Sequence, residues 1–120
     1  MFEWADGNAA GEDRRGLFVT LEGERIRTAT HEDGYVLGAV AAAPAYIGGA
    51  YDPDWPDTPR SWRLEWAAVG LLGKLAVRDD GSCEPDGFCG SDMYGMATVR
   101  AQGYRVLARL TDDMVLICLK

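Results

Sequence analysis

The stretch that decides the fold is Val69-Gly70-Leu71-Leu72-Gly73-Lys74-Leu75-Ala76-Val77, the strongest strand signal in the sequence. It is apolar, two glycines interrupt it, and Asp80-Gly81 follows with the chemistry of a tight turn. A glycine inside a strand indicates a bend or the close approach of another backbone. Short apolar runs bounded by Gly, Asp or Pro are typical of strands. The sequence therefore predicts a β-strand here, and no window of the chain has a convincing helical spacing of apolar residues.

Similar runs extend outward from this stretch in both directions. Leu17–Leu21 and Glu24–Thr28 flank Glu22-Gly23 and predict a hairpin, because Gly accepts the positive φ of a tight turn. A second hairpin is predicted near the C-terminus, from Tyr104–Leu110 and Met114–Leu119. Further short strands are expected at Tyr35–Ala41, Ala45–Gly49, Trp62–Trp66 and Met96–Val99. We therefore predict an all-β fold, a compact sandwich or barrel-like domain of roughly eight to ten short strands with Gly-rich turns.

One segment does not fit a regular strand. Asp52–Ser61 contains three prolines, which lack a backbone N–H and restrict the residue before them. We expect an irregular loop there. The chain of 120 residues, 48% apolar and 26% charged, otherwise fits one soluble domain over residues 1–120, without a signal peptide or a membrane span.

Charge and cysteine content exclude several classes of function. The net charge is −7, and residues 1–60 hold most of it, with 11 acids against 5 bases. We expect neither a nucleic-acid partner nor an anionic membrane, since both need clustered Lys and Arg. The number of cysteines, three, is odd, which argues against a disulfide framework. We therefore expect free thiols in a reducing compartment.

Cofactor and metal motifs are weak. Cys83 and Cys89 are too far apart in sequence for a usual zinc pair, and His31 is the only histidine, so we predict no metal site. His31 lies in a polar turn, where exposure is expected. Lys74 follows Gly70 and Gly73, but the spacing of a phosphate loop is incomplete, and no cofactor is predicted.

The N-terminal segment has the most interesting acidic side chains. Four carboxylates, with two arginines beside them, fall within a short stretch: Glu3, Asp6, Glu12 and Asp13 with Arg14 and Arg15. Paired carboxylates can act as acid and base when their surroundings separate their pKa values. A solvated acidic loop with local arginine pairing explains the same pattern, and the spacing leaves both readings open.

A family resemblance extends these observations. In the first half it rests on Phe2-Glu3-Trp4-Ala5-Asp6-Gly7-Asn8, Glu12-Asp13-Arg14-Arg15-Gly16-Leu17-Phe18-Val19-Thr20-Leu21, Gly23-Glu24-Arg25-Ile26-Arg27 and Tyr35-Val36-Leu37-Gly38. In the second half it rests on Trp66–Lys74, Val77–Cys83, Gly103–Leu107 and Val115–Lys120. These motifs resemble the autoproteolytic C-terminal domains of phage tail spikes and neck appendages, the peptidase G2 type of intramolecular chaperone.

The resemblance implies a chaperone that promotes trimerisation of a phage or prophage tail spike or fibre and is then released by autoproteolysis at its N-terminal edge. Its implied partners are two further copies, in a homotrimer, and the upstream spike domain of the same precursor. Its implied location is the cytoplasm of the bacterial host during phage assembly, with release from the mature spike.

The resemblance also bears on the site. The family's scissile bond lies in a Ser-containing, Tyr-Ala-Glu-like segment just upstream of Phe2-Glu3-Trp4. Because the sequence begins at Met1, we expect this chain alone to be inactive as a self-cleaving peptidase. Glu3 lies nearest to the cleavage site, and Asp13 is the second candidate, as base or orienting acid; a structural role for Glu3 is an equal alternative.

Two other functions fit the sequence. One is a non-catalytic trimeric binding module for a carbohydrate or receptor at a spike tip, suggested by Tyr51, Trp55 and Trp62 around the irregular loop. The other is a structural subunit that only oligomerises. The residues encoded just before Met1 would discriminate best between the three readings.

Overall fold

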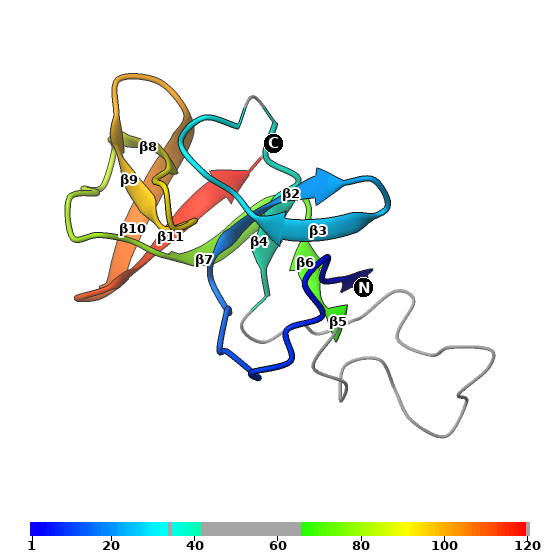
Figure 1. Ribbon diagram of the computed structural model, residues 1–120. Helices are drawn as coiled ribbons and strands as arrows, with labels where there is room; N and C mark the ends of the chain where they lie inside the picture. Colours follow the sequence, from blue (N-terminus) through cyan, green and yellow to red (C-terminus); the bar gives the residue numbers. More distant parts are fainter. Residues whose placement is uncertain (34, 42–65, 120) are drawn as a thin grey trace.

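The structure, a computed structural model, describes residues 1–33, 35–41 and 66–119, and it confirms the all-β prediction (Figure 1). Eleven short strands cover these residues, slightly more than the eight to ten expected. They are β1 (Phe2–Glu3), β2 (Phe18–Glu22), β3 (Arg25–Thr28), β4 (Gly38–Val40), β5 (Trp66–Ala67), β6 (Val69–Gly70), β7 (Gly73–Arg78), β8 (Phe88–Ser91), β9 (Ala97–Arg100), β10 (Tyr104–Thr111) and β11 (Met114–Leu119). A search of these residues for a helix long and apolar enough to span a membrane finds none.

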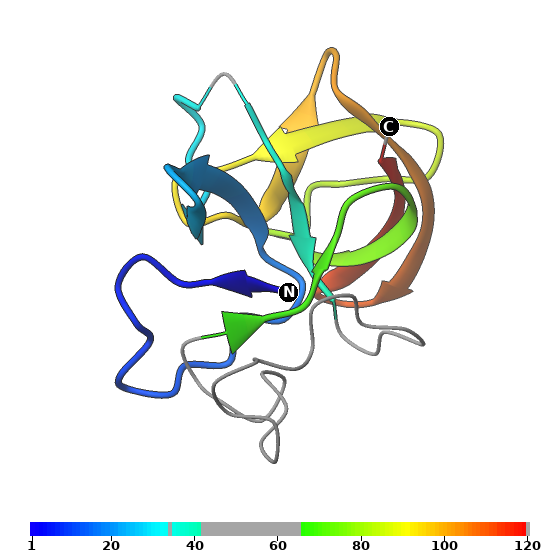
Figure 2. The same ribbon diagram turned by 90° about the vertical axis from the view of Figure 1, so that its right-hand side faces the viewer.

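The strands form three antiparallel sheets. A five-stranded sheet has the order β7-β11-β10-β8-β9, and a four-stranded sheet has the order β3-β2-β4-β6. The short pair β1-β5 makes the third sheet. Figures 1 and 2 show the five-stranded sheet on one side of the four-stranded sheet, and β1 with β5 near its other side, next to the N-terminus.

Both predicted hairpins are confirmed. In the first, Glu22 pairs with Arg25, and Gly23 in the two-residue turn has φ of +67°, a conformation that Gly adopts at little cost. In the second, β10 and β11 run antiparallel from Arg105–Cys118 to Thr111–Met114. Two irregularities in register lie within β10, at Leu107 and Leu110.

The stretch 69–77 is not one strand, as the sequence predicted, but two. β6 pairs with β4 in the four-stranded sheet, whereas β7 pairs with β11 in the five-stranded sheet. The two glycines allow this change of sheet: Gly73 has φ of +90°, and a Cβ on Gly70 would lie 2.4 Å from Leu75 Cδ2. Glycine inside the run therefore bends the chain and lets it pack on itself, as expected for these residues.

The sheets enclose two apolar cores that share β2. Phe18 faces the core against the five-stranded sheet, with Val77, Val106 and Ile117. Its neighbour Val19 points the other way, because side chains alternate along a strand, and packs in a second core. That second core comprises Trp4, Val19, Ile26, Val40 and Ala67, with Phe2, Leu37 and Val69 against it.

Some expectations differ from the structure or fall outside the described residues. The strand predicted at Tyr35–Ala41 is shorter, since β4 covers only Gly38–Val40, although Leu37 N and Ala41 N also donate to Val19 O and Ala68 O. The predicted strand Ala45–Gly49 and the irregular loop Asp52–Ser61 lie outside the described residues, as do Tyr51, Trp55 and Trp62 of the binding-module hypothesis.

A pair of glycine substitutions tests how the two large sheets are joined. Gly95 O accepts a hydrogen bond from Phe18 N at 2.8 Å, and an added Cβ would lie 2.3 Å from Thr28 Cγ2 and 3.1 Å from Phe18 O. Gly81 has a similar positive φ, +93° against +80°, but open space around it. Gly81→Ala should therefore report backbone strain alone, about 1–2 kcal/mol.

We expect Gly95→Ala to lower the free energy of unfolding by a further ~1–3 kcal/mol, because the added methyl overpacks the contact between β2 and the turn before β9. Urea unfolding of both variants and the unsubstituted chain measures this difference. Equal losses in the two variants would contradict the close approach.

Candidate functional site

The first candidate residue, Glu3, lies on a short strand locked at the N-terminal edge. β1 pairs with β5 through Phe2–Ala67 and Glu3–Trp66, and Trp4 bridges to Ile26. Ala5 N then donates to Ile26 O at 2.8 Å. The Glu3 carboxylate, about one-third exposed, lies 3.4 Å from Arg25 Nε. The apolar side chains of this segment thus hold the Glu3 backbone in place while its carboxylate faces an arginine.

Arg14 organises the loop that follows β1. Its guanidinium donates to both carboxylate oxygens of Asp6, at 3.1 and 2.9 Å, and to Glu12 Oε2 at 3.2 Å. The same group lies over the ring of Trp4, 4.5 Å from the centroid, in a cation–π contact. Planar, two-pronged recognition of this kind needs arginine. A cleft of about 280 Å³ opens beside this cluster.

Asn8 closes the same loop from inside. It is buried and has φ of +46°, a left-handed conformation that Asn tolerates better than most residues. Its side chain accepts from Glu12 N at 3.0 Å and donates to Glu12 O at 3.2 Å, while its own N–H donates to Asp6 Oδ1. These hydrogen bonds fix the conformation of the loop. Its acidic residues Asp6 and Glu12 are bound by Asn8 and Arg14.

Asp13, the second candidate, lies on the outer side of this loop. Its carboxylate accepts from Arg15 at 2.9 and 2.8 Å and forms an ion pair with Arg78 at 3.2 Å. Its carbonyl oxygen also accepts from Arg78 Nη2 at 2.6 Å. Glu3 and Asp13 thus have separate arginine partners, and no hydrogen bond or ion pair joins them.

These arginines set the protonation of the loop carboxylates. Hydrogen bonds from Arg15 hold the pKa of Asp13 well below its usual range, and those from Arg14 lower the pKa of Asp6. A carboxylate with a lowered pKa stays ionised at neutral pH and is a weak base. Asp13 is therefore better suited to orient a group or stabilise positive charge than to transfer a proton.

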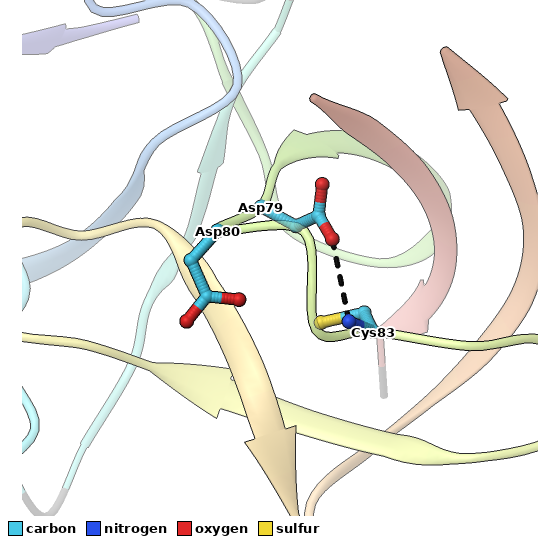
Figure 3. Close-up of side chains that lie close together, drawn as sticks. All are labelled: Asp79, Asp80 and Cys83. Carbon is cyan, nitrogen blue, oxygen red and sulfur yellow. Dashed lines mark hydrogen bonds between the residues drawn. The ribbon is translucent and has the colours of Figure 1, made fainter. Parts of the chain in front are cut away.

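A second cluster, which the sequence did not reveal, surrounds Asp79 after β7 (Figure 3). Its carboxylate is fully buried and accepts from Arg109 at 3.3 and 2.7 Å. Cys83 N also donates to Asp79 Oδ2 at 3.4 Å, the contact drawn in Figure 3. Arg109 donates in addition to the carbonyl oxygens of Cys83, Thr111 and Asp112.

Asp79, Asp80 and Cys83 have ligand atoms within 4.8 Å of one another, a spacing that a metal ion could use. The geometry favours a structural role instead, because Arg109 donates to both oxygens of Asp79. The cluster ties the 79–83 turn to β10.

The remaining sequence candidates lie apart from both clusters. His31 is half exposed in a turn, 3.9 Å from Glu32, as expected. Lys74 lies exposed on β7, and strand rather than helix follows Gly73, so this segment is no phosphate loop. The three cysteines are free thiols; burial raises the pKa of Cys89 to about 12.

Comparison with protein families now identifies the chain. The family described as Peptidase_G2, IMC autoproteolytic cleavage domain, matches residues 1–58 and 48–114. The chain belongs to the peptidase G2 family. A comparison with curated proteins found no match.

Solved structures support the fold of this peptidase G2 domain. The C-terminal fragment of bacteriophage phi29 gene product 12 has a TM-score of 0.80 and 22% identity, over 99% of this chain and 97% of that one. The pre-mature bacteriophage phi29 gene product 12 matches with the same TM-score and identity, but the match covers only 21% of its length. The shared fold therefore corresponds to a small part of that longer chain.

A substitution at Arg14 tests how this peptidase G2 domain holds its N-terminal loop. Arg14→Lys keeps the charge but loses the two-pronged contact with Asp6 and the planar stacking on Trp4, so we expect a loss of ~1–2 kcal/mol in unfolding free energy. Arg15→Lys is the matched control, because Arg15 is 63% exposed and surface pairs contribute about 0–1 kcal/mol. Thermal or urea unfolding compares them, and equal stabilities would show that Arg14 does not organise the loop.

A second ion pair near this loop predicts a pH dependence. Arg27 donates to both oxygens of Asp33 at 2.9 and 2.6 Å, and these hydrogen bonds lower the pKa of Asp33 from 3.8 to about 2. Because the folded pKa lies below the unfolded value, the stabilisation is complete above pH 3.8 and is lost as the pH falls toward 2.

Asp33→Asn should therefore flatten the fall in stability across this acidic range, whereas Asp86→Asn, at an 89% exposed side chain, should leave it unchanged. Urea unfolding at a series of pH values measures the slopes. Equal slopes for Asp33→Asn and the unsubstituted chain would contradict the assignment.

Proposed function

We propose that this domain is an intramolecular chaperone that brings three copies of a phage or prophage tail spike chain together and is then released by cleavage at its N-terminal edge. The observation that supports this most is the family itself, an autoproteolytic cleavage domain. The structure shows how the N-terminal edge is held: β1 pairs with β5, and Trp4, just after β1, bridges to Ile26 of β3. The antiparallel register directs any residue preceding Met1 along the chain that follows Ala67.

The slow assembly of long trimers explains why a tail spike would need a chaperone of this kind. Long intertwined trimers depend on contacts between distant residues, so they assemble slowly and expose aggregation-prone surface. A small domain that associates first raises the effective concentration of the chains attached to it. Cleavage then removes the route back and leaves the trimer kinetically trapped. We place this step in the cytoplasm of the bacterial host, during phage assembly.

Within this proposal the two carboxylates take different roles. Glu3 lies nearest to an upstream bond and has one arginine neighbour, Arg25, at 3.4 Å, so it is the candidate for proton transfer. Asp13, kept ionised by Arg15 and Arg78, is the candidate for orienting a reacting group or stabilising a positive charge.

The test restores an upstream segment ending in Ser and Tyr-Ala-Glu before Met1. We expect the fusion to cut itself into two fragments on a denaturing gel. Glu3→Gln should slow cleavage by roughly 100-fold, the scale of a lost general acid or base. Asp13→Asn should slow it too, while Glu24→Gln, on the exposed β2–β3 turn, should leave it unchanged.

An intact fusion would overturn the cleavage part of the proposal. Normal cleavage by Glu3→Gln and Asp13→Asn would leave self-cleavage standing but dismiss these two residues.

A further inference from the structure

The outer face of the five-stranded sheet bears a row of cations. Pairing across all five strands places Lys74, Cys118, Arg105, Phe88 and Arg100 side by side. Paired residues of neighbouring antiparallel strands point to the same face of a sheet. On β11, Cys118 lies between the buried residues Ile117 and Leu119, so its side chain points away from the core. The other four residues of the row therefore face away from the core as well. We call these five residues the cationic row.

Two of these cations are held by the sheet itself. The Arg105 guanidinium lies over the Phe88 ring, 5.3 Å from its centroid. Arg100 Nη2 donates to Ser91 O at 2.7 Å, and its side chain crosses Gly90, where a Cβ would lie 2.4 Å from Arg100 Cδ. Among the described residues one ion pair involves the row, the exposed pair of Arg105 with Asp86 at 3.5 Å. Lys74 and Arg100 form no ion pair there. Asp33 lines the same cavity as Arg100.

An apolar hollow lies in the middle of this row. A groove of about 470 Å³ is lined by Gly103, Tyr104, Arg105, Leu107 and Cys118. Leu107 is 38% exposed because it occupies an irregular position of β10, where it does not pair. Leu116, two residues before Cys118, adds to the same face. An aromatic or Arg anchor with apolar surroundings and a polar rim is typical of a protein contact.

We propose that the cationic row and its groove form the contact by which one copy of this chain binds the next. This rests on the proposed function, in which three copies associate. The occupant follows from charge: the row contributes three cations and forms one ion pair, with Asp86, in a chain whose net charge is −7, so the other residues together carry a net negative charge. A ring of three copies joins two different surfaces, which suits a basic face meeting an acidic one.

The experiment is sedimentation velocity of the whole chain at low and high salt. We expect a trimer for the unsubstituted chain, weakened at high salt because ions screen the contact. Arg105→Glu and Leu107→Glu should each weaken association at least tenfold and give monomer. Leu72→Glu is the matched control, since Leu72 is 74% exposed but lies in the β6–β7 connection, and it should remain trimeric.

Thermal unfolding of each variant checks that it is folded. A trimer that survives both Arg105→Glu and Leu107→Glu would overturn this contact and leave the proposed function intact. A monomeric unsubstituted chain would overturn the proposed trimer itself, and with it the contact.

Discussion

The first three residues of β2 are buried with side chains on both faces of the strand, and the other layers depend on this burial. Phe18 and Val19, adjacent in sequence, are fully buried in different cores. Each such side chain contributes roughly 1.5–3 kcal/mol when removed from water. β2 therefore acts as a shared wall, and a change in its register by one residue would exchange its two faces and disrupt both cores.

The burial of β2 also explains how the short strand β1 at the N-terminal edge is held in a fixed position. β1 has two residues, too few for a stable strand by itself. Trp4 anchors it in the second core, with Val19 and Ile26, and the Arg14 guanidinium lies over the Trp4 ring. Groups that must keep a fixed geometry are held better by rigid elements than by loops. The N-terminal edge is held in this way, because Trp4 packs in one core with Val19 of β2.

The sequence was sufficient to predict the hairpins and strands that depend on local chemistry. The turn residue Gly23 located the first hairpin, and short apolar runs located β10 and β11. It could not predict that residues 69–77 divide between two sheets, because the division depends on what packs against Gly70. The pair Asp79–Arg109 joins residues 30 apart in sequence, and Asp79 had the pattern of an ordinary turn residue. The Arg14 cluster was partly visible, since two acids directly precede two arginines in Glu12-Asp13-Arg14-Arg15, but the stacking of Arg14 on Trp4 was not.

The shared wall can be tested most directly by residue-resolved amide hydrogen exchange under native conditions. If β2 joins the two cores, the amides of Val19 and Thr20 should exchange only through global unfolding, and those of Ile26 and Ile117, one from each core, should open with the same free energy. If the amide of Ile26 opened with a much smaller free energy than that of Ile117, in a separate unfolding unit, the result would contradict the account. The N-terminal layer would then be an appendage to the five-stranded sheet rather than part of one cooperative structure.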